Sequence, residues 1–347
     1  MTIATHDTIE RPPATSPVEL IMNLSLGYLV SRSLHVAAEL GIADFLRDGP
    51  KTIEVLATQL RAHQPSLRRL LRTLAAYGVF AEDEHGEFTL TPAAALLQQG
   101  VMRDGVLLCG EVAGDGSWWN AVGALRHSVM TGQPAFECQQ GKRFFDYVQD
   151  HPECGRWFDR GMANFATAEN SAMAQAYDFS RFGHLVDVGG GQGGLLAEIL
   201  TSHPTVQGTL FDVPQVVQVP AYVDHARLSG RWRTVGGDFF QSVPVGGDAY
   251  LLKRILHDWS DEHCVRLLRN CAKVMSSTTP LLVMEALVPS GNQPHPAKVM
   301  DILMMVFGEG RERSEQEFNE LFHQAGLRLH ATISTRSTLS VLEVIRA

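Results

Sequence analysis

The chain has 347 residues, of which 45% are hydrophobic and 19% are charged. This composition is ordinary for a soluble globular protein, and the length suggests about two domains. The formal net charge of −9 argues against a general nucleic-acid-binding protein. We therefore expect no nucleic-acid partner. No apolar run is long enough to span a membrane, so we expect no membrane partner either.

The cysteines predict a reducing compartment. The chain has five of them without a C-x-x-C pair: Cys109, Cys138, Cys154, Cys264 and Cys271. An odd, unpatterned set indicates free thiols and not a disulfide framework or a zinc site. Residues 1–15 contain no apolar core region, so they predict a floppy leader and not a signal peptide. The expected location is cytoplasmic.

The amino-terminal part has the pattern of a winged helix. Apolar residues recur at helical spacing over 18–46, and Gly41 ends this helix. Thr52 offers an N-cap for a helix over 53–60, and Pro65 begins another over 66–77. Two short apolar runs then flank an acidic turn at residues 83–86, which predicts a hairpin. We therefore expect a mostly helical winged-helix domain over residues 1–103.

Two uses of this domain are weighed. Arg68, Arg69 and Arg72 lie on the helix that would enter DNA in a ligand-sensing regulator. The hairpin tip is acidic and the whole chain is negative, which disfavours that use. The apolar residues along 20–40 exceed what a small domain needs to bury, so we favour a dimerisation domain and expect a homodimer.

Residues 104–180 are helical and unusually aromatic, and we treat them as a linking region that contributes to a substrate pocket. Most of these aromatic side chains are expected in the core because they bury large areas. Trp119, Phe158 and Met162 are equally good candidates for lining a pocket that takes a flat, apolar molecule.

Residues 181–347 alternate between strands and helices. The expected strands cover 185–188, 208–211, 231–235, 249–252 and 281–285, followed by an antiparallel pair at 327–334 and 339–346. Helices are expected over 194–202, within 213–226, and over 261–274 and 314–325. This order predicts an α/β, Rossmann-like, doubly wound domain that binds ligands beyond the carboxyl ends of its strands.

The central feature of this domain is the stretch LVDVGGGQGGLL at 185–196. Gly189, Gly191 and Gly194 form a G-x-G-x-x-G pattern between a strand and a helix, which alone is a weak sign of a dinucleotide. Glycines let a ligand approach the main chain, and the helix would direct N–H groups at it. Asp187 suits a ligand with an amine or hydroxyls better than a pyrophosphate.

Each predicted strand ends near a polar residue: Asp187, Asp212, Asp238, His257 and Glu285. Asp212 follows the central glycine at the distance typical of an acid that binds a ribose. Asp238 is placed to meet an adenine amino group, with Phe239 against the ring. A nicotinamide cofactor would leave Asp238 and Phe239 unexplained, so an oxidoreductase is the weakest of the alternatives.

At this point the chain resembles a known family. LVDVGGGQGG, FDVP, VGGDFFQSVP, LLKRILHDWSDEHC, MEALVP and GRERSEQEF are similar to successive motifs of the plant-type and bacterial small-molecule O-methyltransferases, such as those acting on caffeate or hydroxyindoles. The resemblance covers most of the chain. It implies S-adenosylmethionine as methyl donor and an aromatic small molecule, such as a bacterial secondary metabolite, as acceptor.

The resemblance also implies roles for individual residues. The cofactor-binding set is Asp187, Gly189, Gly191, Asp212, Val213, Asp238, Phe239 and Lys253. The general base is His257, flanked by the acids Glu285 and Glu312. The substrate-binding set adds Asp258 and Met304 to the three pocket candidates named above.

Elementary chemistry agrees with a histidine base. A phenol with a pKa near ~10 is mostly neutral at pH 7, so a base that removes its proton gains typically about 10²–10⁴ in rate. A carboxylate on the other ring nitrogen would fix the tautomer. A metal held by His257, Asp258 and either His295 or Glu309 is disfavoured because no two histidines there have ligand spacing. A C- or N-methyltransferase on the same scaffold remains an alternative.

Overall fold

The computed structural model describes residues 16–110, 115–218, 228 and 230–347. The predicted leader over 1–15 and most of the helix predicted within 213–226 lie outside the described residues. The chain divides into two compact units, Met1–Gly110 and Glu111–Ala347, and each is described by itself. The finer division into 1–103, 104–180 and 181–347 stays a prediction.

The first unit contains the expected helices and hairpin. Ser16 and Glu19 form a capping box at the start of its long first helix, and Gly41, at a φ of 65°, separates this helix from the next. Its elements are α1 (Pro17–Glu39), α2 (Ile42–Phe45), β1 (Lys51–Thr52), α3 (Ile53–Leu60), α4 (Gln64–Ala76), β2 (Phe80–Glu82), β3 (Glu87–Leu90), α5 (Pro92–Ala95) and α6 (Arg103–Leu108). β1 joins the β2–β3 hairpin in a sheet of order β1-β3-β2, which is the element order expected of a winged helix.

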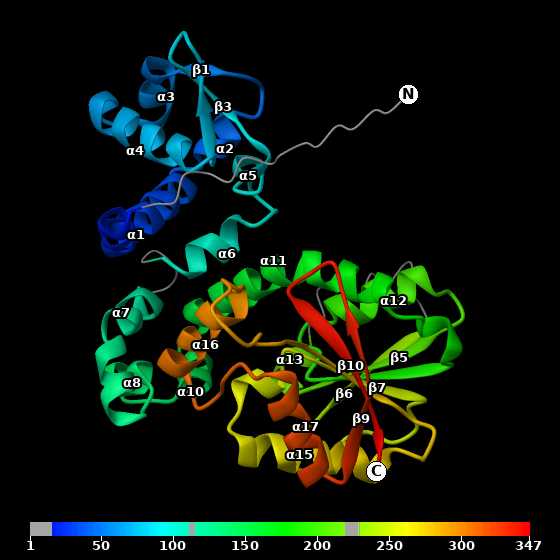
Figure 1. Cartoon of the computed structure of the whole chain (residues 1–347). Helices are drawn as coiled ribbons and strands as arrows, with labels where there is room; N and C mark the ends of the chain where they lie inside the picture. The colour runs from blue at the N-terminus through cyan, green and yellow to red at the C-terminus, as the bar shows by residue number, and fades with distance from the viewer. Residues whose placement is uncertain (1–15, 111–114, 219–227, 229) are drawn as a thin grey trace, which may run out of the picture. The chain divides into compact units, whose positions relative to one another are not determined.

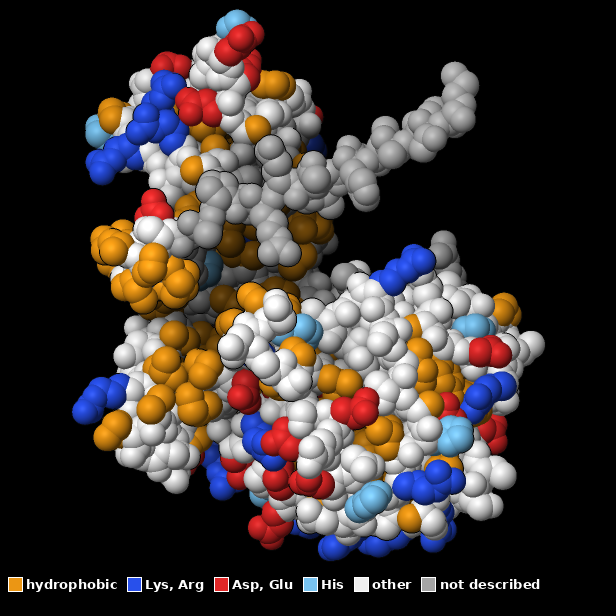
Figure 2. Space-filling view, viewed as in Figure 1, with side chains coloured by type: hydrophobic (Ala, Val, Ile, Leu, Met, Phe, Trp, Pro, Cys, Tyr) orange, Lys and Arg blue, Asp and Glu red, His pale blue; other side chains and the backbone are white. Residues whose placement is uncertain are grey.

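Helix α1 presents an uncovered apolar face. Its exposed apolar side chains are Val18, Leu20, Ile21, Met22, Leu24, Leu26, Tyr28 and Leu29. Figure 2 shows hydrophobic side chains gathered over α1. A contiguous apolar patch of this kind marks an interaction surface, because water contact with it is unfavourable.

The second unit begins with helices and continues as a layered α/β domain. The helices are α7 (Ser117–Gly123), α8 (Leu125–Thr131), α9 (Ala135–Gln140), α10 (Phe144–Asp150) and α11 (Pro152–Ala176), with the short η1 (Phe179–Arg181) leading into the sheet. The sheet has the order β6-β5-β4-β7-β8-β10-β9. Its first five strands are parallel, and β10 pairs antiparallel with both β8 and β9.

The elements of the sheet layer follow the sequence prediction closely. They are β4 (His184–Val188), α12 (Gly194–Ser202), β5 (Gln207–Asp212), α13 (Pro214–Val217), β6 (Trp232–Gly236), β7 (Ala249–Lys253), η2 (Leu256–Asp258), α15 (Asp261–Val274), β8 (Leu281–Ala286), α16 (Pro296–Phe307), α17 (Glu315–Gln324), β9 (Leu327–Ser334) and β10 (Leu339–Arg346). Helix α16 was not predicted. Within the described ranges, none of the helices combines the length and apolarity that a membrane crossing requires.

Two apolar cores lie on the two faces of this sheet. One joins α11 and α12 to the sheet, and the other joins α15 and α17 to its opposite face. Figure 1 shows this three-layer arrangement. Because both faces are covered, the central strands β4, β7 and β8 are almost entirely buried, and the ends of the strands are where a ligand can approach.

Candidate active site

The glycine stretch forms a tight turn at the carboxyl end of β4. Gly189, Gly191 and Gly193 have φ values of 72°, 58° and 86°, a region in which only glycine is unstrained. A Cβ on Gly190 would lie 2.5 Å from Oδ2 of Asp187, so the main chain passes directly over that carboxyl. The turn ends where α12 begins, with its first N–H groups available to a ligand.

Asp187 lies buried beneath this turn. Its Oδ2 has no hydrogen-bond partner among the described residues. Burial raises the pKa of Asp187 to about 7, against the opposing effect of Lys253. A buried carboxyl with a free oxygen next to a glycine turn is suited to a ligand that brings its own donor.

Asp212 holds the turn from the neighbouring strand. Its two carboxylate oxygens accept the N–H groups of Gly191 at 2.8 Å and of Val213 at 2.7 Å. Burial raises the pKa of Asp212, and the two N–H groups oppose that shift. A carboxylate oxygen has two lone pairs, so both oxygens keep acceptor capacity for ribose hydroxyls.

The end of β6 supplies a second acid and an aromatic ring. Asp238 accepts the N–H of Phe240 at 2.8 Å. The ring of Phe239 reaches within 3.4 Å of the Cβ position of Gly189, so it lies against the glycine turn. The structure thus brings Asp212, Asp238 and Phe239 together at one edge of the sheet, as their positions in the sequence predict.

Lys253, at the end of β7, is engaged within the protein. Its Nζ lies 3.1 Å from Oε2 of Glu169 on α11. Burial lowers the pKa of Lys253, while Glu169 and Asp187 raise it. Its predicted contact with the cofactor stays a prediction, and its ammonium group lies among the acids at this end of the sheet.

His257 lies buried in η2, directly after β7. Its Nδ1 is 3.0 Å from Oε1 of Glu312, whose side chain is fully buried. The N–H of Glu312 donates to Asp301 at 2.9 Å, which fixes the acid in place. On the other side of the ring, Nε2 lies 3.5 Å from Oδ1 of Asp258.

Glu285 supports the backbone of this loop. Its Oε1 accepts the N–H groups of Ile255 at 3.0 Å, Leu256 at 2.8 Å and His257 at 3.4 Å. The two glutamates therefore have different geometries: Glu312 contacts the imidazole ring, and Glu285 holds the chain that carries it.

The acids around His257 change its ionisation. Burial lowers the pKa of His257, but Asp258, Glu285 and Glu312 outweigh burial and raise it to about 9. Burial raises the pKa of Asp258 and of Glu285, and His257 opposes both shifts. The ionisation of His257 is therefore coupled to that of Asp258 and Glu285, as in other clusters of a histidine with carboxylates.

An aromatic cluster adjoins this loop. Trp118 lies 4.3 Å from Phe307 on α16 and 6.2 Å from Phe158 on α11, measured between ring centroids. Phe145 stacks on Trp259 at 6.0 Å, which connects the cluster to the chain next to His257. Of the predicted pocket residues, Phe158 belongs to this cluster, and Met162 and Met304 are half-buried on α11 and α16.

Trp118 and Trp119 are adjacent on α7, and both are half-buried. Trp118 contacts the aromatic cluster, and the place of Trp119 in a pocket stays a prediction. Sequence reasoning missed Glu169, Arg254 and Gly310, whose contacts come from elements distant in the sequence.

Of the residues weighed for a metal site, Glu309 and His295 are engaged elsewhere. Glu309 pairs with His263 at 2.7 Å. The ring of His295 caps α16 by accepting the N–H of Ala297 at 3.2 Å. Neither has a contact with His257 among the described side chains, and the expectation of no metal stays a prediction.

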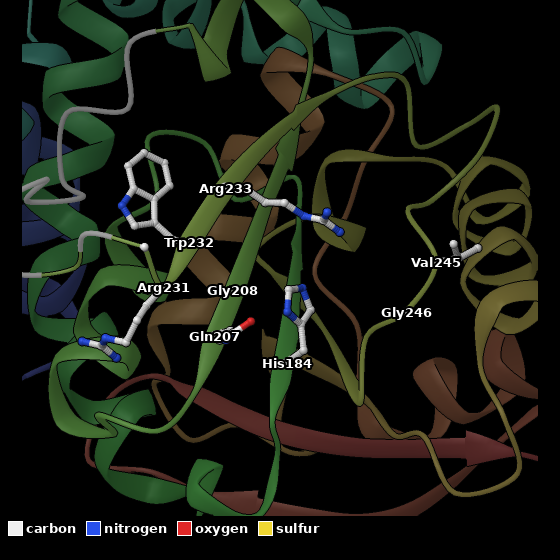
Figure 3. A pocket seen from close by; sticks show the side chains of 9 residues that line it. His184, Gln207, Gly208, Arg231, Trp232, Arg233, Val245 and Gly246 are labelled. Atoms are coloured by element: carbon white, nitrogen blue, oxygen red, sulfur yellow. The ribbon is translucent and has the colours of Figure 1, made fainter.

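A cavity of about 340 Å³ opens at the opposite end of the sheet. Figure 3 shows His184, Arg231 and Arg233 among its lining side chains, at the amino ends of β4 and β6. The guanidinium of Arg231 donates to three carbonyl groups near the end of α12, and Arg233 donates to Thr209. These polar groups serve the fold, and the cavity is separate from the carboxyl edge described above.

The fold and this edge define a class: an α/β enzyme whose glycine turn, acids and aromatic ring receive a nucleoside cofactor. A model of the O-methyltransferase domain matches residues 122–328, and a model of the O-methyltransferase dimerisation domain matches residues 22–100. The chain therefore belongs to the S-adenosylmethionine-dependent O-methyltransferase family. The match over residues 22–100 supports a homodimer. It includes most of the exposed apolar residues of α1, from Met22 to Leu29.

Individual relatives agree with this assignment. The chain is 41% identical to a phenazine O-methyltransferase of Lysobacter antibioticus, over 93% of this chain and 95% of that protein. It is 34% identical to a mitomycin biosynthesis 6-O-methyltransferase of Streptomyces lavendulae, over 95% of both. A methyltransferase of calicheamicin biosynthesis, solved with S-adenosylhomocysteine bound, superposes with a TM-score of 0.86 at 36% identity, covering 96% of this chain and 99% of that one.

Some relatives methylate nitrogen. The phenazine-1-carboxylate N-methyltransferase of Pseudomonas aeruginosa is 32% identical over 94% of this chain and 97% of that protein. The same scaffold therefore serves both oxygen and nitrogen acceptors.

Proposed function

We propose that this enzyme transfers a methyl group from S-adenosylmethionine to a hydroxyl group of an aromatic small molecule of bacterial secondary metabolism, in the cytoplasm, with His257 as general base. The observation that carries the proposal is the buried His257–Glu312 pair at 3.0 Å. Because Nδ1 is occupied by the carboxylate, Nε2 is the nitrogen left to accept a proton.

The residues at the carboxyl edge fit the methyl donor. Asp212 would accept the ribose hydroxyls, Asp238 and Phe239 would take the adenine, and the glycine turn would lie against the amino-acid part, where Asp187 has a free buried oxygen. When bound, S-adenosylmethionine supplies a methyl group already activated on a positively charged sulfur. The protein's remaining task is to align the acceptor and take its proton.

His257 carries out that task through its Nε2. A hydroxyl within hydrogen-bond reach would pass its proton to Nε2 as the new oxygen–carbon bond forms. The resulting imidazolium is stabilised by Glu312 on Nδ1. Glu285 keeps the ring in place by holding the backbone from Ile255 to His257, so its contribution is positional.

The surroundings favour an acceptor that donates hydrogen bonds. Asp258 is 3.5 Å from Nε2, so an acceptor hydroxyl there meets an acid on its other side. The flat part of the acceptor would lie on the aromatic cluster that includes Phe158, with Trp119, Met162 and Met304 as further lining candidates. An amino group could replace the hydroxyl, which keeps N-methylation as the second candidate, in line with the nitrogen-methylating relatives.

The test compares two histidine variants with a panel of phenolic, quinone and polyketide acceptors and labelled S-adenosylmethionine. His257→Ala should keep its affinity for S-adenosylhomocysteine and lose about 10²-fold or more in turnover near neutral pH. His263→Ala is the matched control, since His263 is only six positions away but pairs with Glu309. Equal turnover in wild type and His257→Ala would remove the histidine from the reaction.

A further inference from the structure

Arg254 is a largely buried cation that the proposed reaction does not yet use. It follows Lys253 at the end of β7, and only 23% of its side chain is exposed. Its φ is 52°, in the left-handed region that non-glycine residues seldom adopt. A glycine would take this backbone conformation without strain, so the contacts of the arginine side chain must offset an unfavourable backbone.

One edge of the Arg254 guanidinium is bound to helix α11. Its Nε lies 3.1 Å and 3.2 Å from the two carboxylate oxygens of Glu169, and its Nη2 lies 2.6 Å from Oε1. This two-point pairing fixes orientation as well as distance, which a lysine would not do. Arg254 is thereby joined to Glu169 of α11. The same helix carries the pocket candidates Phe158 and Met162.

The other edge of the guanidinium faces the catalytic acids. Nη1 lies 3.7 Å from Oε1 of Glu312, the same oxygen that contacts the His257 ring. Nη1 is buried and has no hydrogen-bond partner among the described residues. A buried N–H donor without a hydrogen-bond partner lowers the stability of the fold. The position of Nη1 beside Glu312 is explained if the positive charge of Arg254 is needed there.

Charges surround Arg254 from every neighbouring element. They are Glu169 on α11, Lys253 on β7, His257 and Asp258 in η2, Glu285 on β8 and Glu312 in the loop before α17. Asp258, Glu285 and Glu312 all favour the imidazolium form of His257. Arg254 is a buried positive side chain next to Glu312, and a positive charge near an imidazole is of the sign that disfavours a second positive charge on the ring.

We propose that Arg254 is a positioning residue for methyl transfer. Through Glu169 it joins α11 to the end of β7. Its Nη1 edge offsets the negative charge of Glu312, so that His257 is oriented and able to accept a proton. The proposal rests on His257 being the base. It adds a third side chain to the His257–Glu312 pair and couples the acceptor-lining helix to that pair.

The charge is tested with two substitutions of Arg254. Arg254→Met removes the charge and keeps much of the length, and the unbalanced acids should then hold His257 as imidazolium to higher pH. We expect the midpoint of the kcat/KM–pH profile to rise by about half a unit or more. Arg254→Lys keeps the charge, so its midpoint should stay close to that of wild type. Arg328→Met, on the exposed side of β9, controls for net charge.

The tie to α11 is tested with Glu169→Gln. This variant should raise the acceptor KM more than it lowers kcat, and it should combine with Arg254→Met less than additively because the two side chains act as a pair. The ring nitrogens of His257, followed by NMR titration in wild type, Arg254→Lys and Glu169→Gln, give its pKa without an activity assay. That measurement also covers the case in which Arg254→Met fails to fold.

Three results overturn the proposal while leaving the base intact. These are an unshifted midpoint in Arg254→Met, an equal shift in Arg254→Lys and Arg254→Met, and full additivity between the substitutions at Arg254 and Glu169. If instead His257→Ala keeps the wild-type profile, the base assignment itself fails. The two failures are therefore distinguishable in one set of profiles.

Discussion

The pH dependence of the reaction is the sharpest consequence of the site. The pKa of His257 is raised to about 9, because its neighbouring acids outweigh burial. A general base must be neutral to accept a proton. Activity should therefore be low where His257 is protonated and should rise as the pH increases through its pKa.

The size of the effect follows from the pKa. Two units below a pKa of about 9, roughly one molecule in a hundred carries neutral His257, and one unit below it, roughly one in ten. The kcat/KM should thus increase nearly tenfold from pH 7 to pH 8 and should level off above about pH 9 to 10. With an unperturbed histidine the same rise would end near pH 7.

The assay measures kcat/KM from pH 6 to 10 at constant ionic strength, with two acceptors whose hydroxyl groups differ in pKa. If His257 governs the rise, both acceptors give the same midpoint. His257→Ala should lose this midpoint and recover part of its activity only where the acceptor itself ionises. A wild-type midpoint that follows the acceptor, or one near 6.5, would refute the reasoning.

Three further substitutions follow from the contacts. Gly310→Ala should lower kcat by about 10²-fold, since a Cβ there would overlap the carbonyl oxygen of His257 and displace the loop. Gly308→Ala is the control: its Cβ would meet nothing closer than 3.9 Å, so kcat should stay close to that of wild type. Asp212→Ala should weaken S-adenosylhomocysteine binding about tenfold or more by calorimetry, and an unchanged affinity would place the ribose elsewhere. Leu24→Asp, at a side chain 71% exposed on α1, should give monomers in sedimentation experiments, and an intact dimer would move the interface away from this face.

The sequence was sufficient for most of the fold because local signals and global arrangement agree. Helix α3 spans the predicted residues 53–60 with Thr52 as its cap, and β9 and β10 have the predicted limits. Alternation of buried strands and amphipathic helices determined the layers. Helix α16 was missed although Pro296 stands at its first position, because apolar residues such as Val299 and Ile302 also occupy its exposed face.

The chemistry of the site was predictable where it lies within one motif. Asp212 was found from its spacing to Gly191, and the two are hydrogen-bonded at 2.8 Å. His257 was found from the block around it. By contrast, Glu169 and Arg254 are 85 positions apart, and no pattern in either segment predicts their contact. Gly310 looks like an ordinary loop glycine until the backbone of His257 is placed against it.

The balance of charge around His257 is a property of the assembled site and of no single segment. Its acids come from η2, from β8 and from the loop before α17. The cation beside Glu312, Arg254, is held by Glu169 of α11. Taken singly, each of these charged side chains is of a type that is common in catalytic motifs or in ion pairs. Burial alone would lower the pKa of His257, and the three acids gathered around the ring together raise it above that of free histidine. The residue types thus indicate which reaction this site performs, while their packing sets the pH at which the site performs it.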